Sequence, residues 1–266
     1  MADEQIVEPI NILLSREELL LVLDLLQAET IPGLDPDPTL GDLTPDQRSL
    51  ALTVAERALR ARELVQVQDG GELIVHRRLL TAVGVCAYPN SAVLVYHWPS
   101  QADLPVRYFG HLRGNDIVAH SVPDSTLHLF SLLPSREQLV GQVLAVAQVE
   151  EVAAEAIEFS VPAAVLGQAR EQANAAQAEA ALATLTGSDV PAEAAQAFAA
   201  SLSGGPRITI LQLLKQQPGG AARQDITLLQ NGSAAWLVSQ PSTETDTLRV
   251  KTTTPAELSA LLAGAL

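Results

Sequence analysis

Two strand–turn–strand–turn–strand–helix blocks constrain the fold more than any other feature of this chain. Turn residues separate short apolar runs in both blocks, including Gly114-Asn115 in the first and Asn231-Gly232 in the second. The first block has predicted strands at Pro105–Leu112, Ile117–Val122 and Thr126–Leu133 and a helix from Ser135; the second has strands at Ala221–Gln230, Ser233–Gln240 and Leu248–Thr252 and a helix from Thr254. Strands joined by tight turns are antiparallel, so the sequence predicts a mainly antiparallel sheet.

The segments that precede the two blocks also match in order. Strand Ser91–Trp98 corresponds to Arg207–Leu214, and the strand ending at Ser15 corresponds to Ala156–Phe159 with Ser160. We therefore predict an α+β fold of two pseudo-twofold-related β-α-α-β-β-β-β-α units around one sheet. The units would span residues 1–150 and 151–266 of one compact body. The second unit lacks a counterpart to Leu64–Asn90 and is shorter.

Helix starts are marked by capping chemistry. Ser15 with Glu18 and Thr44 with Gln47 form capping boxes, which predict helices over Arg16–Gln27 and Pro45–Glu63. The second helix carries an apolar stripe of Leu50, Val54, Ala58 and Ala61. Later in the chain we predict one long helix over Ala163–Thr184, a helix over Ala192–Leu202 capped from Ser188, and a loop over Gln216–Ala222.

The charge balance limits the classes of partner. The chain has 16 basic and 31 acidic residues and a net charge of −15, which opposes binding to nucleic acid or to an anionic membrane surface. Cys86 is the single cysteine, so no internal disulfide can form, and no apolar run approaches the ~20 residues of a membrane span. The acidic start at Met1 does not resemble a signal peptide. These features predict a soluble cytoplasmic protein.

One segment resembles a known family. Residues Glu56–Val65 resemble the A-x-x-A-L-x-A-R-G-L-V stretch of the EspG family, the cytoplasmic chaperones of type VII secretion, although Glu63 stands at the usual glycine. Further similarities are Asp69-Gly70-Gly71, Leu79-Leu80, Tyr88-Pro89 and the hairpin-plus-helix segment from Asn115-Asp116 to Leu144. The resemblance covers most of the first 150 residues. It implies a pseudo-twofold fold with a central antiparallel sheet, a helical secretion substrate as partner, and no enzymatic activity.

No catalytic or metal motif is present. The chain has no G-x-S-x-G elbow, no phosphate loop and no H-x-x-H spacing. His120 and His128 would face each other across a strand pair and His111 would lie near Val118. We interpret the histidines as polar residues on a solvated sheet face, and Cys86 as a buried inert thiol. We therefore predict no enzyme activity, no catalytic residue, no metal and no cofactor.

A second interpretation concerns the segment of residues 44–90, which resembles an inserted winged helix. Its helix is followed by a small hairpin around Gly70-Gly71. A local basic cluster accompanies it, formed by Arg57, Arg60, Arg62, Arg77 and Arg78. A DNA-binding regulator that uses residues 44–78 is the alternative function, whereas acidic neighbours favour a salt-bridged surface without nucleic-acid binding.

The favoured function is a non-catalytic protein-binding adaptor. It would hold a helical partner against a sheet face and the Trp98–Leu104 loop, because aromatic residues are enriched at partner sites. The predicted contact residues are Tyr96, Trp98, Leu104, Tyr108 and Phe130. The packing of aromatic side chains into the sheet's own core is the alternative interpretation of these residues. Self-association through an edge strand of the sheet is a further expectation.

Overall fold

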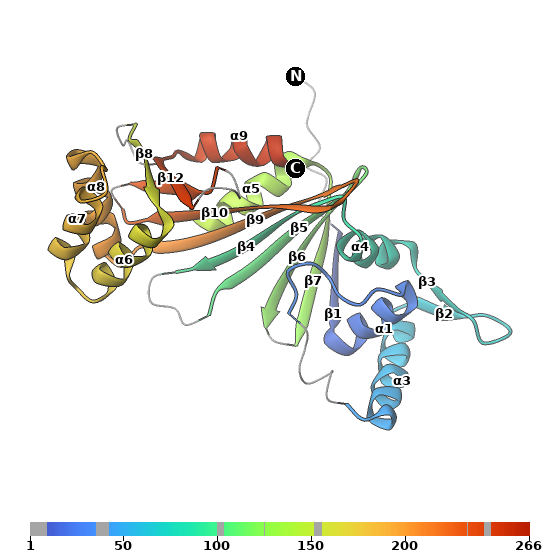
Figure 1. Ribbon diagram of the computed structural model, residues 1–266. Helices are drawn as coiled ribbons and strands as arrows, with labels where there is room; N and C mark the ends of the chain where they lie inside the picture. The colour runs from blue at the N-terminus through green and yellow to red at the C-terminus, as the bar shows by residue number, and fades with distance from the viewer. Residues whose placement is uncertain are drawn as a thin grey trace, which may run out of the picture. The chain divides into compact units, whose positions relative to one another are not determined.

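The computed structural model describes residues 10–35, 43–99, 104–124, 126–151, 156–232, 234–241 and 246–266 (Figure 1). Its helices are α1 (Arg16–Leu26), α3 (Pro45–Ala61), α4 (Arg77–Ala87), α5 (Arg136–Ala147), α6 (Ala163–Asn174), α7 (Ala178–Thr186), α8 (Ala192–Ser203) and α9 (Pro255–Ala265). Its strands are β1 (Ile10–Ser15), β2 (Val65–Val67), β3 (Leu73–Val75), β4 (Ser91–Trp98), β5 (Val106–Arg113), β6 (Asp116–Asp124), β7 (Leu127–Leu133), β8 (Glu158–Pro162), β9 (Arg207–Gln217), β10 (Gly220–Gln230), β11 (Ala235–Ser239) and β12 (Thr247–Thr252). None of the described helices is long and apolar enough to cross a bilayer.

Ten strands form one sheet in the order β1-β7-β6-β5-β4-β9-β10-β11-β12-β8, and β2 and β3 form a separate hairpin. The neighbours β1 and β7, β5 and β6, β6 and β7, and β10, β11 and β12 pair antiparallel. The strand order is the same when read inward from either edge. The edge strand is β1 or β8, and the strands of the meander that follows it in the chain come next in reverse order, β7 to β4 or β12 to β9. The α+β class and the mainly antiparallel sheet are confirmed.

The chain forms two compact units. The first unit comprises Met1–Leu94, Tyr108–Leu139 and Lys215–Gly220, and the second comprises Val95–Arg107, Val140–Leu214 and Ala221–Leu266. Within both units β4 lies against β9. Gln216 N donates to Asn90 O at 2.8 Å in the first, and His97 Nδ1 lies 2.8 Å from Thr209 Oγ1 in the second. The division of the chain into repeats at residue 150 stays a prediction.

The core of the first unit lies between its sheet and helices α1, α3 and α4 (Figure 1). Ile12 and Leu14 of β1 pack there with Phe130 of β7 and Leu79 of α4. Cys86 is fully buried in this core, as predicted, and burial raises the pKa of its thiol well above the ordinary value. The thiol is thus protonated and inert.

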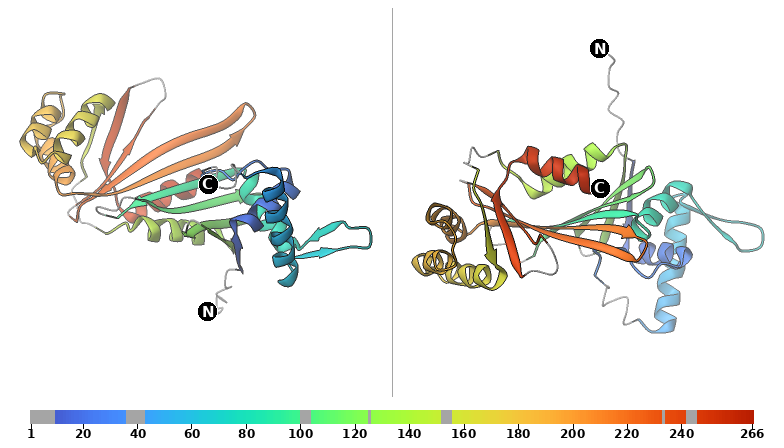
Figure 2. Two further views of the ribbon diagram at one scale, coloured as in Figure 1. Left: turned by 90° about the horizontal axis from the view of Figure 1, so that it is seen from below. Right: turned by 45° about the horizontal axis from the view of Figure 1, so that its top comes forward.

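The core of the second unit is organised by three aromatic rings. Phe159, Phe198 and Trp236 meet edge to face, with centroids 5.1 to 6.3 Å apart. The Trp236 indole donates to Ser201 Oγ at 2.9 Å, which satisfies its only polar atom. Helices α6, α7 and α8 all contribute side chains to this core. Both views in Figure 2 show these three helices gathered beside β8.

Four details differ from the sequence prediction. The helix predicted over Ala163–Thr184 is broken into α6 and α7, because Ala176 adopts a left-handed backbone (φ 59°). Ser188 does not cap α8: its hydroxyl donates back to Thr184 O, and the cap residue Pro191 makes no side-chain bond. The predicted loop over Gln216–Ala222 is mostly strand, because β9 and β10 form a long hairpin. The strand predicted at Ala156–Phe159 is Glu158–Pro162.

The two predicted capping boxes are confirmed. Ser15 Oγ and Thr44 Oγ1 each accept the N3 amide, and the N3 side chains of Glu18 and Gln47 bond back to the cap amides. Glu63, which occupies the usual glycine position of the resembled motif, has a left-handed backbone (φ 57°). The position therefore favours glycine even though this chain carries glutamate there.

Candidate functional site

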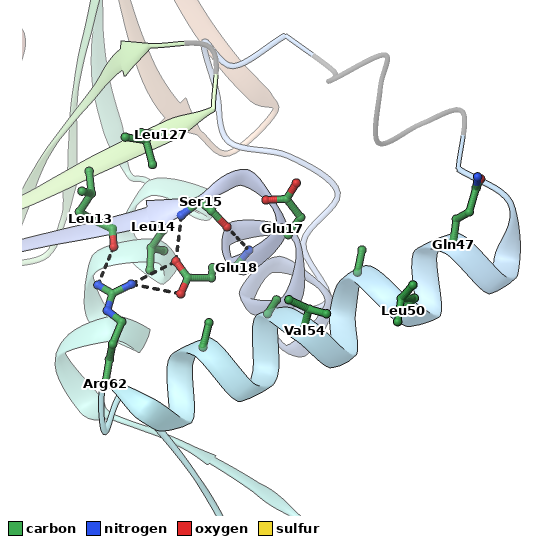
Figure 3. A pocket seen from close by; sticks show the side chains of 13 residues that line it. Leu13, Leu14, Ser15, Glu17, Glu18, Gln47, Leu50, Val54, Arg62 and Leu127 are labelled. Carbon is green, nitrogen blue, oxygen red and sulfur yellow. Dashed lines mark hydrogen bonds and ion pairs between the residues drawn. The ribbon is translucent and has the colours of Figure 1, made fainter.

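An apolar groove of about 570 Å³ lies on the first unit (Figure 3). We call it the α3 groove. Helix α3 forms one wall, and the end of β1 with the start of α1 forms the other. It is lined by Leu13, Leu14, Ser15, Glu17, Glu18, Gln47, Leu50, Ala51, Val54, Ala55, Ala58, Arg62 and Leu127.

The predicted apolar stripe of α3 faces this groove rather than the core. The side chains of Leu50 and Val54 are 66% and 55% exposed, whereas Ala55 and Leu59 are buried in the core. On β1, Leu13 is 42% exposed beside the groove. Aliphatic side chains left this open on one face of a helix are typical of a surface that receives a partner.

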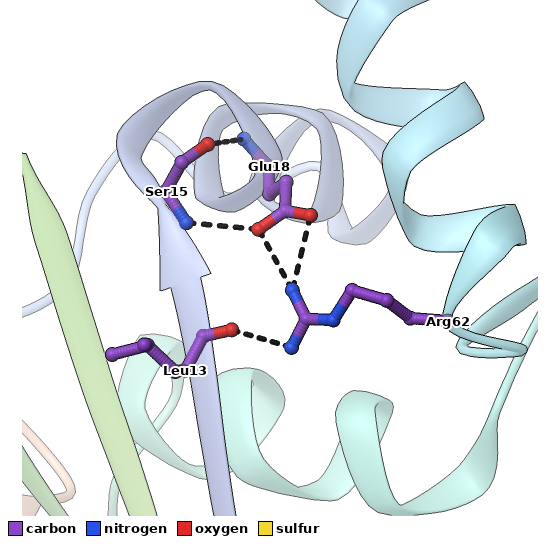
Figure 4. A network of polar contacts seen from close by, with 4 residues as sticks. All are labelled: Leu13, Ser15, Glu18 and Arg62. Atoms are coloured by element: carbon purple, nitrogen blue, oxygen red, sulfur yellow. Dashed lines mark hydrogen bonds and ion pairs between the residues drawn. The ribbon is translucent and has the colours of Figure 1, made fainter.

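The floor of the groove ends at an ion pair between Glu18, which is buried, and Arg62, whose side chain is 41% exposed (Figure 4). Glu18 is 5% exposed, and both of its carboxylate oxygens accept from Arg62 Nη1 at 3.1 Å. Glu18 Oε2 also accepts from Ser15 N at 2.9 Å, and Arg62 Nη2 donates to Leu13 O at 2.6 Å. Two helices and one strand are therefore tied together by a single carboxylate–guanidinium contact.

Several polar groups that line the groove have partners within the protein. Ser15 Oγ accepts from Glu18 N, Gln47 Oε1 accepts from Thr44 N, and Glu17 lies 3.7 Å from Arg16. The remaining lining is mainly aliphatic, which suits the binding of an apolar surface.

The second unit has a smaller hollow of about 300 Å³ between α6 and the strands β10 to β12. Leu166, Leu229 and Leu248 form its apolar surface, and Arg170 and Asp225 lie at its border. It is half the volume of the α3 groove and has fewer exposed aliphatic groups.

Four histidines, His97, His111, His120 and His128, lie inside the protein, which corrects the expectation of a solvated sheet face. His111 and His120 are fully buried, and His120 Nε2 lies 3.1 Å from His128 Nδ1, so these two are in contact as predicted, although on a diagonal of the sheet. The His120 ring stacks on Phe130, with centroids 4.5 Å apart. Burial lowers the pKa of His111 to about 3, and burial together with its two histidine neighbours lowers that of His120. Both imidazoles are neutral at physiological pH.

The basic cluster of the winged-helix-like segment is partly consumed by ion pairs. The predicted hairpin is present as β2 and β3, which extend away from α3 and α4 (Figure 1). Arg60 pairs with Glu56 at 3.4 Å, however, and Arg62 is bound to Glu18. These ion pairs fit the interpretation of the cluster as a salt-bridged surface.

The five predicted contact residues fall into two groups. Tyr108 and Phe130 are buried in the protein, whereas Tyr96 and Trp98 are half-buried on β4 and Leu104 is 78% exposed. Residues 100–103 of the predicted contact loop lie outside the described residues. A role of these five residues in partner binding stays a prediction. Within the described ranges, no three histidine, cysteine or carboxylate side chains are placed to hold a metal ion.

Sequence reasoning missed the α3 groove, although its signal was present. Helix α3 carries apolar residues on two sides, Leu50–Val54–Ala58 and Ala55–Leu59, and a helix at the edge of a domain buries only one of them. An apolar stripe beyond the one needed for packing marks a surface for another molecule.

Comparison with known proteins supports the fold rather than a close relationship. No protein-family model matches the sequence, and no curated protein matches it. Among solved structures, the chain is similar to the Mycobacterium tuberculosis type VII secretion system chaperone EspG5, solved in complex with a PE25–PPE41 dimer. The match has a TM-score of 0.65 and 12% identity, and it covers 96% of this chain and 95% of that chain. Over nearly its whole length, this chain has the fold of an EspG chaperone.

Proposed function

We propose that this chain is a non-catalytic protein-binding adaptor of the EspG type, and that the α3 groove receives a helical segment of its partner. The observation that carries the proposal is the open apolar stripe of α3 along the groove. The fold supports it, because the similar chaperone EspG5 was solved with a bound protein dimer. The expected setting is the cytoplasm.

The shape of the groove favours a helix over an extended strand. Lining residues recur along one face of α3 from Gln47 to Arg62, which corresponds to about 22 Å of helix at ~1.5 Å per residue. The backbone of β1 beside the groove is already bonded to Arg62 and Glu18, so a strand would find no partners there. A helix satisfies its own backbone and needs only apolar contact, as in helix-in-groove recognition.

Partner capture with groove variants tests the proposal. The purified chain should retain one stoichiometric partner from its native cells at physiological salt. Leu50→Glu with Val54→Glu should weaken that complex at least tenfold, since each buried aliphatic side chain contributes about 1.5–3 kcal/mol. Calorimetric titration of the purified partner measures the change in Kd.

Ile74→Glu is the matched control. Ile74 is 44% exposed on β3, in the same unit but outside the groove, so this variant should bind like the wild type. Equal binding by the groove variant and the wild type would remove the groove from the proposal. The absence of any stoichiometric partner would remove the adaptor function itself.

A further inference from the structure

The outer edge of β1 borders the α3 groove at Leu13 and Ser15, and its backbone carries a second feature. β1 is the first strand in the sheet order, so one side of its backbone has no neighbouring strand among the described residues. Backbone groups of alternate residues face opposite sides of a strand. Arg16 N donates to Thr126 O at 3.1 Å on the β7 side, so Leu14 and Ile12 also face β7, whereas Ser15, Leu13 and Asn11 face outward.

Side chains occupy the outward groups where β1 ends. The N–H of Ser15 is bound by Glu18, and the C=O of Leu13 is bound by Arg62 (Figure 4). The same two side chains bind each other, with only 7% of the Glu18 side chain exposed. A strand that approached this edge would meet a closed donor and a closed acceptor, which is one way proteins prevent edge-to-edge pairing.

The opposite edge strand, β8, is closed at the equivalent position by other means. Ala163 N donates to Asp246 O at 2.8 Å, as Arg16 N does to Thr126 O, so Pro162 of β8 corresponds to Ser15 of β1. Proline has no N–H to offer to an added strand. The last residue of each edge strand, Ser15 or Pro162, therefore has no N–H available to an added strand. The means differs between the two edges, which points to a shared requirement.

We propose that the β1 edge is a strand-docking surface that Arg62 and Glu18 hold closed, and that β1 of a second copy of this chain is the strand it accepts when opened. Antiparallel pairing about a twofold axis is self-complementary, because each copy offers the same outward donors and acceptors. Ile10 and Leu13 are exposed there and would be covered in both copies. The freed Glu18 and Arg62 of the two copies have opposite charges, which opposes the repulsion between two chains of net charge −15.

Sedimentation velocity without any partner protein tests this proposal, so its outcome is independent of the adaptor function. The wild type should sediment as a monomer. Glu18→Gln with Arg62→Gln removes the ion pair without leaving a buried charge, and this variant should sediment at twice the mass, with the monomer recovered on dilution. If this double variant stays monomeric with an unchanged circular dichroism spectrum, the proposal is overturned.

Two further variants separate edge pairing from general loosening. Arg48→Ala breaks another α1–α3 ion pair, to Asp24 at 2.7 Å, but touches no β1 backbone, so it should remain monomeric. Leu13→Pro, added to the Glu18→Gln, Arg62→Gln double variant, removes an outward N–H that makes no bond to β7. It should restore the monomer. Dimerisation of Arg48→Ala, or persistence of the dimer with Leu13→Pro, would show that the β1 edge is not the interface.

A more conservative variant still tests the proposal if the double variant fails to fold. Arg62→Lys keeps a charge beside Glu18 but replaces the two-nitrogen fork with one amine, so it cannot hold Glu18 and Leu13 together. It should fold and dimerise more weakly than the double variant. A strictly monomeric Arg62→Lys, alongside an unfolded double variant, would also count against the proposal.

Discussion

His111 lies fully buried on β5, and neither of its ring nitrogens has a hydrogen-bond partner among the described residues. A charged imidazolium in such a place would lose its hydration without compensation, and burial therefore lowers its pKa to about 3. His120 lies on the neighbouring strand β6 and His128 on the next strand, β7, and burial also lowers the pKa of His120. The first unit thus keeps neutral histidines in its interior.

The buried histidines make stability dependent on pH. Below the ordinary pKa of 6.5, the unfolded chain binds a proton at His111 while the native chain does not, so stability is full above 6.5 and is lost as pH falls toward about 3. At about 1.4 kcal/mol per pH unit, His111 alone should account for about 2 kcal/mol between neutrality and pH ~5. Urea denaturation at the two pH values measures the loss.

Two variants assign that loss. His111→Leu should reduce the pH slope without abolishing it, because His120 still contributes. His76→Asn is the comparison variant away from the buried histidines, since His76 is exposed and caps α4, a role that asparagine also fills. A slope in His111→Leu equal to that of the wild type would contradict the burial argument.

Individual residues were predictable where their chemistry is local. Cys86 sits in an apolar helix, and its burial follows from that context. The histidines alternate with apolar residues along strands, and alternation alone does not reveal which face is covered. Helices α1 and α4 cover the histidine face, a tertiary arrangement that the residues themselves do not encode.

At the scale of elements, the helix caps permit a direct comparison. Thr44→Ala should cost about 1 kcal/mol, because Thr44 Oγ1 accepts the Gln47 amide at the start of α3. Ser188→Ala should cost clearly less, because that hydroxyl bonds to Thr184 O and leaves α8 uncapped. Thermal unfolding of both variants measures the difference, and a larger loss at Ser188 would restore it as a cap.

Helices and hairpins were predictable because turns and caps act within a few residues. Strand β4 has the predicted bounds, and α1, α3, α5 and α9 begin where their caps indicate. The break between α6 and α7 carries no glycine or proline; it depends on packing, including the bond from Thr184 Oγ1 to Gln172 Oε1 at 2.8 Å. The long β9–β10 hairpin was missed because its tip is polar and strand pairing is non-local.

The α3 groove marks the limit of the same reasoning at the element scale. The amphipathic pattern of α3 shows that Leu50 and Val54 share a face, but not whether the core or another molecule covers it. Whether this face is covered depends on how α1 and β1 pack against α3. The contact between Glu18 and Arg62, which are 44 residues apart in the sequence, fixes that packing.

At the scale of the whole molecule, the order of elements was predictable and the pairing of strands was largely so. The duplicated strand and turn pattern predicted an antiparallel α+β fold, and the similarity to EspG5 over 96% of the chain confirms the resemblance found in Glu56–Val65. Sequence identity of 12% means that the fold is specified by turn chemistry and patterning rather than by shared residues.

The net charge of the chain leads to a prediction about the alternative function, DNA binding. A short DNA duplex titrated with this chain at low salt should show no change in fluorescence anisotropy through the micromolar range. The chain carries 31 acidic against 16 basic residues, and Arg60 and Arg62 of the winged-helix-like segment are engaged by Glu56 and Glu18. Saturable binding that weakens with added salt would instead support a DNA-binding regulator.

Pro162 has a consequence for how far assembly through the sheet could proceed. Pro162 has no N–H to offer at the end of β8 under any conditions, whereas the Ser15 N–H at the end of β1 is unavailable only while Glu18 holds it. If the proposed opening of β1 gives each molecule one docking edge, strand addition ends with a pair of molecules rather than a fibre.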